Sequence, residues 1–147
     1  MYDAICCPTD GSHGSDAAVE HACELAALAD ARVHALFVVD ESIAGAAEWD
    51  MVVEREEARG ERALNAVAAA GERHGVPVDR HLRRGRAHEE ILDAAGDYGV
   101  DLIVMGTEGR SGLGRFLSAG SVAERVVRHS SVPVLTVRTS EERGDDA

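Results

Sequence analysis

The sequence contains no lysine: its 15 basic residues are all arginines, against 27 aspartates and glutamates. The formal net charge of −12 argues against a general nucleic-acid-binding surface, because phosphate backbones are bound by basic patches. The absence of lysine also excludes a Walker-type loop, which places Gly-Lys-Ser/Thr at a helix start. A strongly acidic, lysine-free surface suits either a high-salt cytoplasm, which screens self-repulsion, or simply a GC-rich genome, and we favour a halophilic source as the hypothesis.

Aromatic residues and long apolar runs are also scarce. Phe, Trp and Tyr make up 3% of a chain that is 45% hydrophobic, so the core must be built from Ala, Val, Leu and Ile. No stretch approaches the roughly 20 apolar residues of a membrane span. The first residues lack the basic start and long apolar centre of a signal peptide. We therefore expect a cytoplasmic protein with no membrane span.

Cysteine is rare as well. Cys6, Cys7 and Cys23 are odd in number and contain no Cys-x-x-Cys pair, which argues against a disulfide framework. Cys6 and Cys7 fall in the first apolar run, where cysteine behaves as a small hydrophobe. We expect packing rather than redox chemistry from them.

What is present is an alternation of strand-like and helix-like segments along 147 residues. This βαβαβαβαβ pattern predicts one α/β domain over residues 1–138, with helices on both faces of a parallel sheet. Residues 139–147 form an acidic tail that is expected to be mobile. The expected strands are 3–8, 32–40, 76–85 (charged, hence at an edge), 100–106 (apolar, hence central) and 132–138, and the expected helices are 14–31 (capped by Ser15), 51–74 (ended by Gly75), 88–99 and 121–130.

Two turns at the carboxyl ends of predicted strands are candidate ligand sites, because open parallel sheets bind ligands at that edge. The first turn reads PTDGSHGS, from Pro8 to Ser15. Pro8 ends the strand, and Asp10 can accept hydrogen bonds from a ligand's amino group or ribose hydroxyls. The structural alternative is that Asp10 and Ser12 only cap the turn and the helix.

The second turn, GTEGRSGLGRFLSAGS, runs from Gly106 to Ser121. Gly106 and Gly109 permit close approach of a ligand to the backbone. Gly120 and Ser121 open the last helix, where free N–H groups and the helix dipole favour an anion. Arg110 can neutralise phosphate oxygens or lie in solvent. The residues alone leave a phosphate-binding turn and a structural loop equally open.

The sequence contains no clear match to the catalytic or metal-binding motifs considered next. His88 starts a His-Glu-Glu-Ile segment that lacks the second histidine of a zinc helix, and capping of the helix by His88 and Glu89 is the simpler interpretation. His21 and His34 fall in a helix and a strand, where packing or surface roles are expected. No Gly-x-Ser-x-Gly elbow joins a strand to a helix.

Four stretches resemble the universal stress protein family: ICCPTDGS (5–12), ALFVVDES (35–42), GRAHEEILDAAGDYGVDLIVMGTEGRSG (85–112) and AGSVAERVVRHSSVPVLTVR (119–138). The four stretches are distributed along nearly the whole chain. The resemblance implies a Rossmann-like, three-layer α/β sandwich, similar to adenine nucleotide alpha-hydrolases, with a five-stranded parallel sheet of order 3-2-1-4-5. Strands 1 and 4 are neighbours in that order, so both candidate turns flank one crevice. It also implies a dimer.

The resemblance further implies a nucleotide site. Members that bind ATP carry Gly-x2-Gly-x9-Gly-Ser/Thr in the second turn, and Asp10 and Val38 match positions that hold adenine and ribose. Ten residues instead of nine separate Gly109 from Gly120, which reshapes the turn, and Glu108 stands where such members often have histidine. A carboxylate there repels phosphate unless a metal bridges the two. The candidate nucleotide-binding residues are Pro8, Thr9, Asp10, Val38, Met105, Gly106, Gly109, Arg110, Gly120, Ser121 and Val122.

The leading hypothesis is a regulatory stress-response module that binds ATP or AMP with Mg²⁺ or Mn²⁺ and acts on an unidentified regulatory protein. Because strand 132–138 is apolar on both faces and lies at an edge in the implied order, we expect a homodimer through it. A second hypothesis is a dimeric interaction protein of the same fold that binds no nucleotide, supported by the longer turn and Glu108. A third is a nucleotide hydrolase or an adenylating enzyme, for which no catalytic base is evident, although slow turnover could occur by metal polarisation alone.

Overall fold

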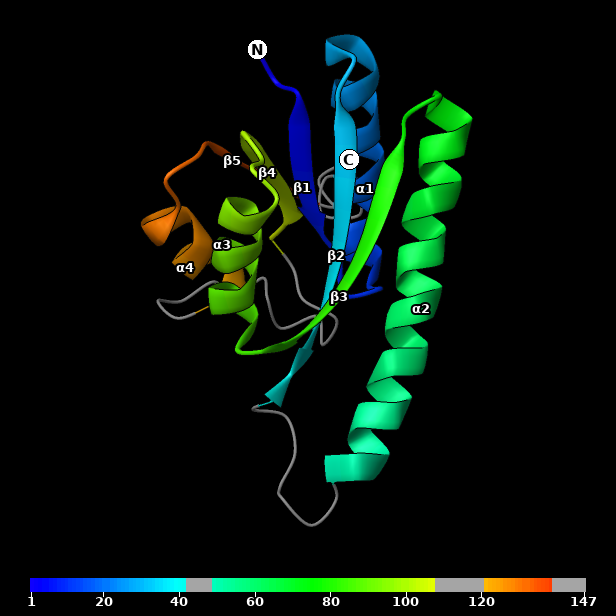
Figure 1. Cartoon of the computed structure of the whole chain (residues 1–147), viewed down its shortest axis with the longest axis vertical. Helices are drawn as coiled ribbons and strands as arrows, with labels where there is room; N and C mark the ends of the chain where they lie inside the picture. The colour runs from blue at the N-terminus through cyan, green and yellow to red at the C-terminus, as the bar shows by residue number, and fades with distance from the viewer. Residues whose placement is uncertain (42–48, 108–120, 139–147) are drawn as a thin grey trace, which may run out of the picture.

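The computed structural model describes residues 1–41, 49–107 and 121–138, and these follow the expected alternation of strands and helices (Figure 1). The predicted tail, 139–147, lies outside the described residues. The strands are β1 (Ala4–Pro8), β2 (Arg32–Asp40), β3 (Val78–Gly85), β4 (Leu102–Gly106) and β5 (Val134–Val137), and the helices are α1 (His13–Ala29), α2 (Trp49–His74), α3 (Ala87–Asp97) and α4 (Val122–His129).

The five strands form one parallel sheet in the order β3-β2-β1-β4-β5, as the resemblance implied. β1 lies in the centre: Ala4 is opposite Arg32 of β2, and Ile5 is opposite Leu102 of β4. The charged strand β3 is at an edge and β4 is internal, so both predictions are confirmed. The direction of winding reverses between β1 and β4, which places a crevice at their carboxyl ends.

Two apolar clusters hold the three layers together. Helices α1 and α2 cover one face of the sheet, where Cys7 and Phe37 are fully buried, and α3 and α4 cover the other face, where Cys6 and Leu36 are fully buried (Figure 1). Successive residues of β1 and β2 therefore enter opposite clusters, as the two-residue period of a strand requires. The core consists mainly of small aliphatic side chains, in line with the composition.

Helix α2 packs closely on the sheet because two of its glycines face it. A Cβ added at Gly60 would lie 2.7 Å from the ring of Phe37, and one at Gly71 would lie 2.4 Å from the side chain of Val78. Both distances are shorter than real Cβ contacts, so larger residues would push the helix outward. This close approach brings α2 beside the turn that follows β1.

The helix starts differ from the predictions at two places. Ser12, and not Ser15, is the N-cap of α1, because the Ser12 hydroxyl accepts the N–H of Ser15 at 3.3 Å. Helix α3 begins after Arg86, which makes no capping bond through its side chain. His88 and Glu89 therefore lie in the first turn of α3 rather than capping it, and the negative charge of Glu89 there suits the helix dipole.

Other boundaries are close to the predictions. Gly75 follows the last residue of α2 with φ +68°, a left-handed conformation that favours glycine, so its predicted role is confirmed. Strands β3, β4 and β5 each begin two residues later than expected. Within the described ranges, no helix is both long and apolar enough to cross a bilayer.

The three cysteines are buried and free. Burial raises the pKa of the Cys6 thiol to about 12 and that of Cys23 to about 11, and it raises the pKa of Cys7 well above its ordinary value. Because the thiolate is the reactive form, these residues are inert at neutral pH. The predicted packing role of Cys6 and Cys7 is confirmed.

Candidate functional site

Both candidate turns start at the same edge of the sheet. β1 ends at Pro8 and its parallel neighbour β4 ends at Gly106. The two strand ends are brought together by helix α1: a Cβ added at Gly106 would lie 2.7 Å from the carbonyl oxygen of Gly14. Gly106 is therefore needed for packing in addition to any contact with a ligand.

The turn after β1 satisfies its own backbone N–H groups. The N–H of Thr9 donates to the carbonyl of Leu36 in β2 at 2.8 Å. The next three N–H groups donate to side chains of the turn itself: Asp10 N–H to the Ser15 hydroxyl at 3.1 Å, Gly11 N–H to the Thr9 hydroxyl at 3.2 Å, and Ser12 N–H to Asp10 Oδ1 at 2.9 Å. Four consecutive donors are thus occupied, and this turn does not present them to an anion.

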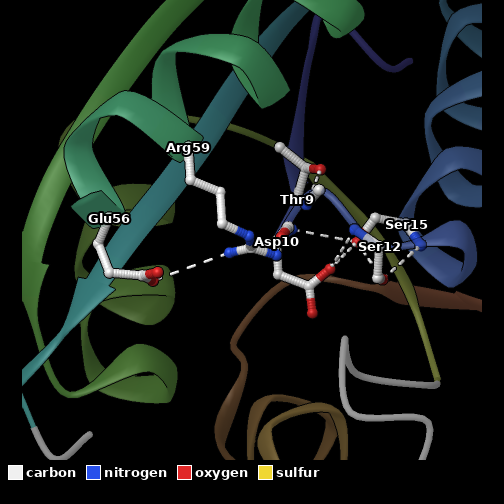
Figure 2. Close-up of polar contacts among 7 residues, drawn as sticks. Thr9, Asp10, Ser12, Ser15, Glu56 and Arg59 are labelled. Carbon is white, nitrogen blue, oxygen red and sulfur yellow. Dashed lines mark hydrogen bonds and ion pairs between the residues drawn. The ribbon is translucent and has the colours of Figure 1, made fainter. Parts of the chain in front are cut away.

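Two groups anchor the carboxylate of Asp10. Its Oδ1 accepts the N–H of Ser12 at 2.9 Å and the hydroxyl of Ser15 at 2.8 Å. Its Oδ2 is directed away from both serines (Figure 2). The structural interpretation of Asp10 and Ser12 as residues that organise the turn is correct. The anchoring also fixes the orientation of the carboxylate, which a ligand-binding role requires.

Arg59 and Glu56 are part of this site, and the sequence analysis missed them. Arg59 reaches from α2 to the turn, where Nη2 donates to the backbone carbonyl of Asp10 (Figure 2). Its Nη1 lies 3.7 Å from Oε1 of Glu56, whose side chain is only 9% exposed. Its guanidinium also lies over the ring of Phe37, 5.6 Å from the centroid. The available signal was the Glu–Arg spacing of three residues on one helix face, which is too common to indicate a site.

A groove of about 650 Å³ begins at the same turn and runs between α1 and α2. Thr9, Gly11 and Arg59 form its end at the edge of the sheet, and the rest of its lining combines small apolar residues of α2 with charged residues of both helices. The turn is therefore bordered by α2 on one side and by β4 on the other.

Ser121 and the start of α4 form the second part of the site. The Ser121 hydroxyl caps the helix by accepting the N–H of Glu124 at 3.1 Å. The same hydroxyl carries a proton that it can donate. The N–H groups of Val122 and Ala123, in the first turn of the helix, have no intrahelical acceptor. Together with the helix dipole, these donors favour an anion at this end of α4.

The apolar candidates lie on the α3 and α4 face of the sheet. Met105, at the end of β4, is 5% exposed, and Val38 of β2 is half-buried; both pack in the cluster under α3 and α4. Pro8 and Thr9 are buried at the end of β1, and Val122 is exposed at the start of α4. The described candidates thus come from the ends of β1, β2 and β4 and from α4. Gly109, Arg110 and Gly120 lie outside the described residues, as does Glu108, so the expectations on the longer turn stay predictions.

Two histidines of the neighbouring strands β2 and β3 form a separate cluster. His34 Nδ1 of β2 and His81 Nε2 of β3 share a hydrogen bond of 2.9 Å, and both rings stack on Tyr98 at the end of α3. Burial lowers the pKa of each histidine; the neighbouring His34 lowers that of His81 further, and Asp79 partly opposes both shifts. His34 packs as expected, and His21 is exposed on α1 as expected.

The described part of the site contains no grouped metal ligands. Among residues 1–41, 49–107 and 121–138, no three or more His, Cys, Asp or Glu side chains are grouped in a way that could hold a metal ion. This arrangement of anchored carboxylate, apolar strand ends and capped helix is suited to binding.

A doubly wound parallel sheet with a polar turn after its central strand and a capped helix after the neighbouring strand defines a Rossmann-like α/β protein. The model of the universal stress protein family matches residues 1–138. The chain belongs to this family, as its sequence motifs indicated.

Known relatives agree in sequence and in fold. The chain is 39% identical to the universal stress protein MJ0531 of Methanocaldococcus jannaschii, over 94% of this chain and 83% of that one. It superposes on the solved structure of MJ0577 from the same organism with a TM-score of 0.77 at 35% identity, covering 94% of this chain and 96% of that one. A universal stress protein solved in complex with cAMP has a TM-score of 0.74 at 27% identity, with 95% and 99% covered.

Proposed function

We propose that this protein is a stress-response module that binds an adenine nucleotide, ATP or AMP, at the carboxyl edge of β1 and β4. The observation that carries the proposal is the pairing of a fixed Asp10 carboxylate with the capped start of α4 across the point where the winding reverses. The cAMP complex of a relative supports the choice of an adenine nucleotide.

In this proposal, the two turns bind different parts of the nucleotide. Because the N–H groups after β1 are already occupied, this turn is poorly suited to phosphate. Asp10 instead accepts hydrogen bonds from the adenine amino group or the ribose hydroxyls, with Pro8, Thr9, Val38 and Met105 as the apolar wall. The phosphates would lie at the start of α4, near Ser121, Val122 and Gly106. Gly109, Arg110 and Gly120, which lie outside the described residues, stay predicted phosphate contacts.

Magnesium or manganese would be bound together with the phosphates of the nucleotide. The described residues offer no ready-made metal site, so phosphate oxygens would supply most of the ligands. The ion would offset part of the repulsion between the nucleotide and a chain of net charge −12. AMP, with fewer charges, would depend less on the metal than ATP does.

Isothermal titration of the full chain with ATP and with AMP, each with and without Mg²⁺ in high salt, tests the proposal. Saturable binding of either nucleotide, at one site per chain, is the expected result. A phosphate-release assay on the same samples tests for slow, metal-assisted hydrolysis. Absence of binding by both nucleotides would contradict the proposal and leave a dimeric interaction protein as the better hypothesis.

We further propose a homodimer through β5. This strand is the edge opposite β3, its residues Val134, Leu135 and Val137 are half-buried, and Thr136 is exposed. Pairing with the same strand of a second chain would cover this edge. The dimer would then act on a regulatory protein in the cytoplasm of a halophilic organism. Each chain would contribute one domain over residues 1–138.

A further inference from the structure

In the described part of the site, the side chain of Arg59 joins α2 to the turn that follows β1. Arg59 donates from Nη2 to the backbone carbonyl of Asp10, a residue 49 positions earlier in the chain (Figure 2). The guanidinium is held from two other directions, by Glu56 at 3.7 Å and by the face of the Phe37 ring. The side chain of Arg59 is only 22% exposed, so this geometry is not that of a mobile surface arginine.

Asp10 is consequently held at three points. Its N–H donates to Ser15, its Oδ1 accepts from Ser12 and Ser15, and its carbonyl accepts from Arg59. The first two points hold the backbone N–H and the carboxylate of Asp10 at the start of α1. The third ties the backbone of the turn to α2, and because a charged donor makes the stronger kind of hydrogen bond, it restrains the peptide plane after Asp10.

The next residue, Gly11, lies directly beside this contact. It has φ +78°, a left-handed conformation that favours glycine, and a Cβ built there would lie 3.4 Å from Nη2 of Arg59, an ordinary contact distance. Glycine is therefore favoured here by the turn of the backbone. Without the arginine, the peptide between Asp10 and Gly11 would keep the bond of its N–H to the Thr9 hydroxyl but would lose the charged partner of its carbonyl.

We propose that Arg59 is a positioning residue for the nucleoside: it orients Asp10 by holding its carbonyl, and it does not contact the phosphates. This inference rests on the proposed adenine-nucleotide site. Its direct consequence is that Arg59 contributes to the affinity for adenosine, AMP and ATP by the same factor. An arginine that bound phosphate would contribute more as phosphates are added.

The test is isothermal titration of Arg59→Met with adenosine, AMP and Mg-ATP. We expect the affinity to fall roughly tenfold for all three ligands, the size of one lost charge-assisted hydrogen bond. Arg59→Lys, which keeps the charge and one donor, should recover part of the loss. Arg62→Met is the matched control, since Arg62 is exposed on the same helix and lines the same groove, and its affinities should equal those of the wild type.

Coupling to Asp10 distinguishes positioning from a general loss of stability. In an Asp10→Ala background, Arg59→Met should have little further effect on binding, because the group that it orients has been removed. If Arg59→Met does not fold, Arg59→Lys replaces it, and a smaller loss that is again equal for the three ligands is expected.

The possible outcomes separate this inference from the proposed function. A wild-type chain that binds none of the three ligands overturns the proposed site, and this inference with it. A wild type that binds while Arg59→Met binds equally well overturns the positioning role alone. A loss that grows from adenosine to ATP, or that is fully additive with Asp10→Ala, also overturns it.

Discussion

Replacement of Ser121 separates two roles that its hydroxyl is expected to combine. The hydroxyl caps α4 by accepting the N–H of Glu124 at 3.1 Å, and in the proposed site it also donates to a phosphate. Ser121→Ala removes both roles. Ser121→Asp keeps the cap, because aspartate is as good an N-cap as serine, but it places a negative charge where the phosphates are proposed to lie.

Ser121→Ala should have the lower thermal stability of the two variants, and Ser121→Asp should have the weaker affinity for ATP. Loss of the cap in Ser121→Ala costs about 1 kcal/mol of unfolding free energy, which lowers Tm by roughly 3 °C for a chain of this size. Loss of a hydrogen bond to a charged phosphate costs about 1.5–3 kcal/mol of binding, or roughly a 10- to 100-fold weaker affinity. Ser121→Asp should retain the wild-type Tm and bind ATP still more weakly than Ser121→Ala.

Thermal unfolding and titration with Mg-ATP measure both quantities on the same samples. Adenosine is the matched ligand, since it lacks phosphates and its affinity should be nearly equal in all three proteins. If Ser121→Asp binds ATP as the wild type does, the phosphates do not lie at the start of α4 and the assignment of this end of the helix is wrong.

Three further changes are expected to have measurable effects. Gly106→Ala should lower Tm and weaken nucleotide binding, because its Cβ would lie 2.7 Å from the carbonyl oxygen of Gly14; a wild-type melting curve would contradict the close approach. Because the pKa values of His34 and His81 are lowered in the folded state, the unfolded chain binds more protons, and stability should fall as pH drops below about 6.5. His81→Phe should make the Tm less dependent on pH. If its Tm falls with pH as steeply as that of the wild type, the His34–His81 pair is not the cause. Thr136→Glu, at the exposed position of β5, should halve the mass measured by light scattering in high salt, whereas a surviving dimer would place the interface elsewhere.

The fold could be predicted from the sequence because its main signals are local. The apolar segment of β4 and the charged segment of β3 indicate internal and edge positions, and the sheet order confirms both. Gly75 ended α2 as expected because a left-handed residue is a strong and local requirement. The order of the strands came from the family resemblance, since alternation of strands and helices alone permits several ways of winding.

The site was less predictable because its geometry depends on contacts between distant elements. Ser12 and Ser15 both suit an N-cap, and which of them caps α1 depends on where the chain turns after Pro8. The local signal of Arg59, its spacing of three residues from Glu56, is too common to indicate a site: Arg59 reaches the turn because Gly60 allows α2 to approach Phe37. The occupied N–H groups of the β1 turn also follow from side-chain positions that no sequence pattern specifies.

In the proposed site, an acidic chain without lysine would bind the phosphates of a nucleotide through groups that act at short range. The net charge of −12 repels a nucleotide over the whole surface, but the Debye length falls from about 10 Å at 0.1 M salt to about 3 Å at 1 M. High salt therefore removes most of the long-range repulsion. Backbone N–H groups and the Ser121 hydroxyl act within a hydrogen-bond length, where salt screens them little. The proposed site thus combines an acidic surface suited to high salt with a binding edge that does not depend on lysine.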